Sequence, residues 1–207
     1  MEPQVLNHPI AQTMLTRLRQ KNTSSLEFRS LVRQLTVLLG LEATADLPTI
    51  THTIQTPVAT CSSPILDASV AIIPILRAGI GMAEPLIEMI PDAVVRHLGL
   101  FRDEETLQPV TYYEKLPGGH LPDVCLVVDP MLATGGTAIA TVKLLRKWGA
   151  VDIRFLGILG APEGVAALLE SDPEVRIYLA GLDERLNERG YILPGLGDAG
   201  DRQYNTL

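Results

Sequence analysis

Apolar runs alternate with amphipathic segments along most of the chain, and this alternation predicts strands that alternate with helices. The five residues Val124–Val128 are all apolar, which is typical of a strand buried on both faces of a sheet. Further strands are expected at residues 49–58, 69–76, 94–101, 153–159 and 175–179. Strands and helices that alternate in this way favour an α/β fold with a mostly parallel sheet.

Helices are expected where apolar residues recur every three or four positions. Residues 8–20 have this spacing, and a second helix is expected to begin at Ser24 or Ser25, either of which can cap it, and to stop at Gly40. The other expected helices follow residue 79 and span residues 139–148 and 162–169.

Residues 103–120 differ in composition from the segments on either side. Two extended segments with turn residues between and after them are expected there. Such an excursion is typical either of a mobile flap over a site or of a β-ribbon at an interface. We find no repeats or low-complexity linkers, so we expect a single domain over residues 1–207.

The composition is that of a globular protein with an ample core, since 46% of the 207 residues are hydrophobic and 20% are charged. A net charge of −7 argues against a general nucleic-acid-binding protein, which needs a basic face. The two cysteines are too few for a disulfide framework: Cys125 is expected in the core and Cys61 in a loop. Without a visible secretory signal or an apolar run long enough to span a bilayer, we expect a cytoplasmic protein.

The strand at 124–128 is followed by Asp129 and then by the small residues Ala133–Thr137. Gly135 and Gly136 let the backbone approach an anion, and the N–H groups of a first helical turn would donate to it. Asp129 suits sugar hydroxyls or a phosphate-bound Mg²⁺. The segment therefore suits a phosphorylated sugar, although such a run, taken alone, is equally typical of a tight turn.

Arginines follow two other predicted strands. Arg77 comes after residues 69–76 and Arg102 after residues 94–101. An arginine at the carboxyl end of a parallel strand can donate two hydrogen bonds to a phosphate. Taken singly, each arginine is more typical of a surface ion pair.

The tail contains the spacing G-x-G-x-x-G at Gly195, Gly197 and Gly200. In a dinucleotide-binding fold this motif opens a helix and precedes a further strand, but only seven residues follow Gly200. We therefore interpret the segment as a glycine-rich loop whose backbone contacts a flat ligand.

Together and in this order, these motifs resemble the uracil phosphoribosyltransferase family. The resemblance extends from residue 7 to the tail and rests on residues 74–79, 101–107, 126–137 and 190–201. Pro130 stands where other type I phosphoribosyltransferases have a second acid, as it does in this family. Leu41, Thr137 and residues 203–206 depart from the residues usual in the family.

The resemblance implies a type I phosphoribosyltransferase core, in which helices flank a mostly parallel sheet, with a flap or β-arm and a hood built from terminal segments. It implies N-terminal helices and hood in residues 1–60, a core in 69–180 with its flap at 103–120, and a base-binding tail in 181–207.

The resemblance also implies a reaction, in which uracil and 5-phospho-α-D-ribose 1-diphosphate (PRPP) give UMP and diphosphate. The residues that it assigns to PRPP are Arg77, Arg102, Asp129, Pro130, Met131, Leu132, Ala133, Thr134, Gly135, Gly136, Thr137 and Asp198. Those that it assigns to uracil are Ile192, Gly197, Asp198 and Ala199. Arg77, Arg102, Asp129 and Asp198 would act by charge and positioning, with Mg²⁺ carried by PRPP and Asp198 as its candidate protein ligand.

The resemblance implies a homodimer or larger homo-oligomer, and GTP as a candidate effector, because some family members are activated by it. Neither nucleic acid nor membrane is an expected partner. Two alternatives keep the fold: a regulator that senses PRPP or UMP, and an enzyme that uses a purine or orotate. The acidic charge disfavours a regulator that binds nucleic acid, and orotate calls for a cation where residues 191–201 offer acids.

Overall fold

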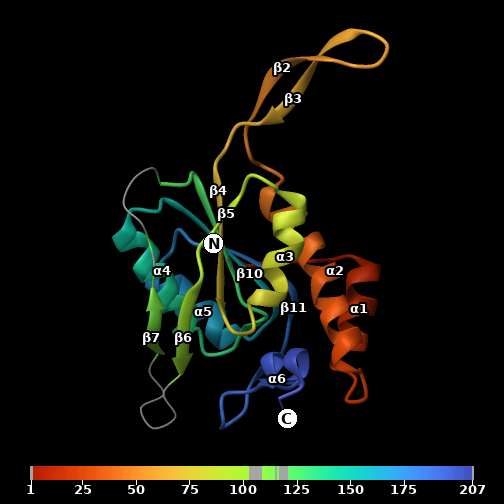
Figure 1. Cartoon of the computed structure of the whole chain (residues 1–207). Coiled ribbons are helices and arrows are strands. Elements are labelled where there is room, and N and C mark those ends of the chain that lie inside the picture. Colours follow the sequence, from red (N-terminus) through yellow and green to blue (C-terminus); the bar gives the residue numbers. More distant parts are fainter. Residues whose placement is uncertain (1, 103–108, 115, 117–120, 207) are drawn as a thin grey trace.

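A nine-stranded sheet with helices on both faces forms the body of the protein in the computed structural model, which describes residues 2–102, 109–114, 116 and 121–206 (Figure 1). Along the sheet the order is β1 (Gln4–Val5), β11 (Arg176–Leu182), β10 (Asp152–Gly160), β8 (Val124–Val128), β4 (Val70–Leu76), β6 (Leu98–Arg102) and β7 (Pro109–Glu114). Two short strands pair at its side, β5 (Val94–Val95) with β4 and β9 (Met131–Leu132) with β10. Of the strand pairs in this sheet, β6–β7 is antiparallel and the others are parallel, which confirms the predicted mostly parallel sheet.

Helices cover the two faces of the sheet in separate groups. The helices are α1 (Pro9–Arg19), α2 (Ser25–Thr44), α3 (Ile80–Met89), α4 (Gly136–Trp148), α5 (Pro162–Ser171) and α6 (Ala199–Tyr204). The core on one face joins β4 and β8 to α1, α2 and α3, and the core on the other face joins the same strands to α4 and α5. Val70 and Ile72 point into the first core, whereas Ala71 and Ile73 point into the second, as the alternation of side chains along a strand requires.

The second helix does not stop at Gly40 as we expected. Ser24 caps it, with its hydroxyl accepting from the Glu27 N–H, but the helix continues to Thr44. A Cβ at position 40 would lie 2.6 Å from Leu86 Cδ2, so Gly40 allows α2 to pack closely against α3. This glycine marks a helix–helix contact and not a helix end.

Residues 49–66 form an antiparallel ribbon of β2 (Thr49–Gln55) and β3 (Thr60–Leu66). The sequence predicted the first strand but placed Cys61 in a loop, whereas Cys61 lies in β3, opposite Ile54. The ribbon projects from the body at the end opposite to α6 (Figure 1).

The strand expected at 94–101 is divided into β5 and β6, with Arg96 and His97 between them. Of the predicted flap, residues 103–108, 115 and 117–120 lie outside the described residues, and 109–114 form β7. No helix among the described residues is both long and apolar enough to cross a membrane.

The segment after β8 packs tightly against the start of α5. The Ala161 N–H donates to the Leu132 carbonyl over 3.0 Å, and a Cβ at position 164 would lie 2.3 Å from the Ala133 carbonyl oxygen. Any side chain at position 164 would therefore push α5 and the segment 132–133 apart.

We expect Gly164→Ala to lower the free energy of unfolding by about 1–3 kcal/mol, because the added methyl group overlaps backbone atoms that cannot move easily. Chemical denaturation of the purified variant measures this change. Gly136→Ala is the matched control: a Cβ there meets only Thr134 Oγ1, at 3.8 Å, so stability should stay within about 1 kcal/mol of the parent. Equal stability of the two variants would contradict the close contact.

Candidate active site

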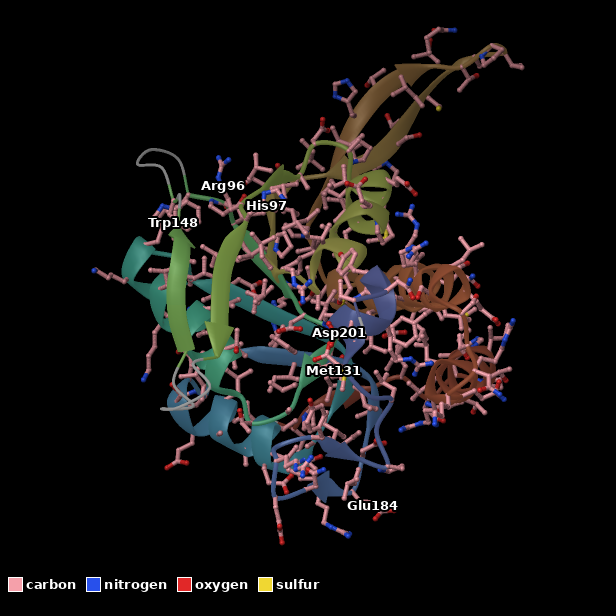
Figure 2. The ribbon with its side chains drawn as sticks, turned by 60° about the horizontal axis from the view of Figure 1, so that its bottom comes forward. Arg96, His97, Met131, Trp148, Glu184 and Asp201 are labelled. Carbon is pink, nitrogen blue, oxygen red and sulfur yellow. The ribbon has the colours of Figure 1, made fainter. Side chains whose placement is uncertain are left out.

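A cavity of about 410 Å³ lies at the carboxyl end of the sheet, between the ends of β4 and β8 and the tail. Figure 2 turns this end of the molecule toward the viewer and labels Met131 of β9 and Asp201 of α6 near its centre. The cavity is lined by Arg77, Ala78, Asp129, Met131, Ala133, Arg189, Gly190, Tyr191, Ile192, Asp198, Ala199 and Gly200. Segments that are more than 100 residues apart in the sequence therefore meet here.

Arg77 lies in the short loop between β4 and α3. This loop packs directly on the end of β8, because a Cβ at position 79 would lie 2.3 Å from the Val128 carbonyl oxygen. The loop thus places Arg77 at the same cavity as Asp129, the residue that follows Val128. The Arg77 side chain is 60% exposed, and its Nη2 lies 3.6 Å from Asp201 Oδ1, so it is available to a ligand.

Asp129 stands at the end of β8, and its Oδ1 accepts a hydrogen bond from the Met131 N–H over 3.3 Å. The pKa of Asp129 is raised to about 7, mainly by burial and to a smaller extent by the nearby negative charge of Asp198, while the hydrogen bond from the Met131 N–H opposes both effects. The carboxyl group is therefore poised to change its charge near neutral pH, which is a property of functional sites.

The segment Ala133–Thr137 leads into α4. Gly135 has φ of +80° and is the N-cap of α4, and no side chain accepts a hydrogen bond at this cap. The first N–H groups of a 13-residue helix are therefore free of a side-chain cap at this end, as an anion site requires. Ala133 lines the cavity, and Thr134, Gly135, Gly136 and Thr137 continue from it without lining it.

Pro130 and Leu132 belong to the support of this loop. Leu132 is 1% exposed and lies in the core beneath α4 and α5. The Pro130 carbonyl accepts from the N–H groups of Ile158 and Leu159, at 3.0 and 2.9 Å. Pro130 and Leu132 do not line the cavity, whereas Met131, which stands between them in the sequence, does.

The glycine-rich tail forms the opposite wall of the cavity. Ile192, Asp198 and Ala199 line it as expected, and Gly197 lies in the same loop without lining it. Gly195 and Gly197 have φ of +69° and +81°, which a residue with a side chain rarely adopts. The tail is thus a shaped backbone loop and not a dinucleotide-binding turn.

An ion pair from outside the predicted motifs holds this loop in shape. Asp183 is 9% exposed; its Oδ2 accepts from the Gly195 N–H at 2.8 Å and from Arg19 Nη1 at 2.8 Å. Arg19 Nη1 also donates to the Gly195 carbonyl over 2.9 Å. Arg202 adds hydrogen bonds to the carbonyls of Leu18 and Leu196. The end of α1 therefore fixes the tail loop from behind.

Five cavity residues were not predicted as site residues: Ala78, Arg189, Gly190, Tyr191 and Gly200. Arg189 is exposed, and its guanidinium has no ion pair or hydrogen bond among the described residues. The turn that carries it is held by Asn187 Oδ1, which accepts from the N–H groups of Arg189 and Tyr191 at 2.9 Å. The only sequence signal for this residue is its position next to the predicted tail motif.

One predicted site residue, Arg102, has no described side chain. Arg102 ends β6, but its side chain lies outside the part of the chain whose side chains are described. Among the described residues no three His, Cys, Asp or Glu side chains gather as a metal cluster, although the carboxylates of Asp129 and Asp198 both line the cavity.

Sequence comparisons agree over nearly the whole chain. The family profile of uracil phosphoribosyltransferase matches residues 5–206. A protein of Roseiflexus castenholzii named uracil phosphoribosyltransferase is 53% identical over 202 residues, which are 98% of this chain and 97% of that relative. A protein of Streptococcus agalactiae with the same name is 52% identical over 204 residues, 98% of each chain.

Solved structures share the fold. A protein of Aquifex aeolicus superposes with a TM-score of 0.91 at 34% identity, over 98% of each chain. The APRTase of Giardia lamblia superposes with a TM-score of 0.52 at 16% identity, over 75% of this chain and 81% of that one, which shows a likeness of fold alone. The chain therefore belongs to the uracil phosphoribosyltransferase family.

Proposed function

We propose that the protein transfers the phosphoribosyl group of PRPP to N1 of uracil, which gives UMP and diphosphate. One observation carries this proposal: a single cavity joins Asp129 and Ala133, the first residue of the small-residue segment that leads into α4, to the glycine-rich tail loop. The first half suits a phosphorylated sugar and the second a small flat base. Membership of the family supports the same pair of substrates.

The 5′-phosphate would lie at the start of α4. The backbone N–H groups of Gly135–Thr137 and the hydroxyls of Thr134 and Thr137 are the donors in this segment. Gly135 has a positive φ, and the N–H groups of a helix start are a suitable site for an anion. Ala133 offers little bulk where the sugar would enter.

Asp129 would accept hydrogen bonds from the ribose hydroxyls. This contact fixes the ring while positive charge develops at C1′ and the bond to diphosphate breaks. Arg77, and Arg102 on the evidence of its motif, would neutralise the charge that builds on the leaving diphosphate. Catalysis would then consist mainly of positioning and charge stabilisation.

Mg²⁺ would enter with PRPP. Asp129 and Asp198 supply the carboxylate oxygens that this ion prefers, and Mg²⁺ sites commonly combine one or two carboxylates with phosphate oxygens of the substrate. Asp198 is the candidate protein ligand. When bound, the ion would supply further positive charge against the diphosphate.

Uracil would lie against Ile192, Asp198 and Ala199 of the tail loop, where backbone groups can bind its carbonyl and N–H groups. Asp183 and Arg19 hold this loop through hydrogen bonds to Gly195, which helps to fix the backbone groups that the loop offers to the base.

Incubation with uracil, PRPP and Mg²⁺ should release UMP, which chromatography separates from uracil. Orotate, adenine and hypoxanthine, tested in parallel, should give product at no more than about one hundredth of the uracil rate, because the two purines carry a second ring and orotate carries a carboxylate that would lie beside Asp198. A folded protein that forms no UMP would contradict the proposal.

Asp129 makes the reaction dependent on pH. Since burial raises its pKa to about 7, the free enzyme carries a proton on this carboxyl below that pH, and the protonated group is a poorer acceptor for two hydroxyls. We expect kcat/KM for PRPP to fall about tenfold per pH unit well below pH 7. Asp129→Asn should lower kcat/KM at pH 8 by about 10- to 100-fold and remove this acid limb.

An equilibrium measurement checks the same residue without activity. The folded protein keeps a proton on Asp129 up to about pH 7 that the unfolded chain releases near pH 4. Folding stability should therefore decline from pH 4 to pH 7 by more in the parent than in Asp129→Asn. If the parent and Asp129→Asn had the same acid limb, or lost the same stability between pH 4 and pH 7, the titration would belong to another group.

We further propose that one face of the β2–β3 ribbon packs against a second copy of the chain. Ile50, Ile54 and Ile65 share one face of the ribbon and are 45%, 38% and 42% exposed. An isolated two-stranded ribbon is marginally stable in water, so this face calls for a covering surface. The family resemblance to homo-oligomers supports a second copy as the partner.

Replacement of Ile50 and Ile65 by serine should shift the mass measured by light scattering from that of a dimer or larger assembly toward that of the monomer. Replacement of Thr51 and Thr53, on the other face of the ribbon, by serine is the control and should leave the mass unchanged. A parent protein that is monomeric at about 10 μM would overturn this part of the proposal. GTP is a candidate effector on the ground of the resemblance, since some members of the family are activated by it.

A further inference from the structure

The tail helix α6 contacts the loop that carries Arg77. Tyr204 Oη donates to the Arg77 carbonyl over 3.3 Å, and Gln203 Nε2 donates to the Ala78 carbonyl over 3.1 Å. The Arg77 side chain itself lies 3.6 Å from Asp201. Three residues of one short helix therefore contact two successive residues of the loop.

The Tyr204 hydroxyl lies at the beginning of α3. The N-cap of this helix is Gly79, which supplies no side-chain acceptor for the first N–H groups. The Gly81 N–H faces the Tyr204 hydroxyl, and burial raises the pKa of this tyrosine, so the hydroxyl keeps its proton at neutral pH. The hydroxyl therefore donates to the carbonyl of Arg77 and lies beside the first turn of α3.

Gln203 fills the space beside this contact. Its side chain is fully buried, and a Cβ at position 81 would lie 2.1 Å from its Oε1. The main chain of Gln203 is held in turn by Arg29, whose Nη1 donates to its carbonyl over 2.6 Å. The contact between α6 and the loop is therefore packed from both sides and anchored to α2.

The other end of α6 belongs to the wall of the cavity. Asp198 lines the cavity and also caps α6, because its Oδ1 accepts from the Asp201 N–H over 2.9 Å. A helix of six residues consequently connects the proposed uracil wall to the proposed diphosphate contact.

We propose that Tyr204, with Gln203 beside it, is a positioning residue for Arg77: it holds the 77–79 loop so that the guanidinium faces the diphosphate of PRPP. This inference rests on the proposed reaction. The Arg77 side chain is 60% exposed and has one distant ion-pair partner, so its direction depends on the backbone from which it extends. Tyr204 fixes that backbone at the residue itself.

Tyr204→Phe removes one hydroxyl and keeps the ring that packs beside α3. We expect kcat/KM for PRPP to fall about fivefold, the equivalent of one hydrogen bond of about 1 kcal/mol. At saturating PRPP, kcat/KM for uracil should change by less than about twofold, since the tail loop is held separately by Asp183. Tyr178→Phe, at a buried tyrosine of β11, is the matched control and should leave both values unchanged.

A double-mutant cycle separates positioning from general support of the fold. If Tyr204 acts through Arg77, then Tyr204→Phe should have no further effect on kcat/KM for PRPP in the Arg77→Ala background. A fivefold loss in both backgrounds would overturn the proposal, as would a Tyr204→Phe enzyme that matches the parent. A parent protein that forms no UMP would refute the proposed reaction, and this result is distinguishable from a failure of the proposed role of Tyr204.

Discussion

The contact between Gly79 and the end of β8 is the constraint on which the site depends. A Cβ at position 79 would lie 2.3 Å from the Val128 carbonyl oxygen, so the turn after β4 lies directly on the end of its neighbour. Because β4 and β8 are parallel and adjacent, Arg77 and Asp129 emerge at the same edge of the sheet. A guanidinium group and a carboxyl group are thereby brought to one cavity by the packing of the backbone.

The second wall of the cavity depends on a different kind of interaction. The tail loop has two glycines with positive φ and makes few hydrogen bonds within itself, so it needs support from elsewhere. Asp183 supplies it: a carboxylate that is 9% exposed would be costly without partners, and Arg19 and the Gly195 N–H together satisfy it. Replacing Arg19 would leave the buried Asp183 carboxylate without its cation, so the pair ties the tail to the end of α1.

The sequence predicted those parts of the site that consist of consecutive residues. Local patterns identified the apolar run before Asp129, the small residues up to Thr137 and the glycines of the tail. The fold class followed from the alternation of predicted strands and helices. Gly40 shows the limit of such reasoning, because its role is a contact with Leu86, a residue 46 positions away that no local pattern identifies. Arg189 was missed for the same reason: only the fold brings it to the cavity that Asp129 lines.

The charges around the cavity explain why an acidic protein can still bind a polyanion. Asp129 is half-buried at the cavity, and its raised pKa lets the free site carry less negative charge than its residues suggest. Arg77 and Arg189 stand on the lining with little or no ion pairing, so their charge is not neutralised in advance. The net charge of −7 therefore belongs to the rest of the surface. What matters for an anionic substrate is the local field of the cavity, which the fold sets independently of the overall charge.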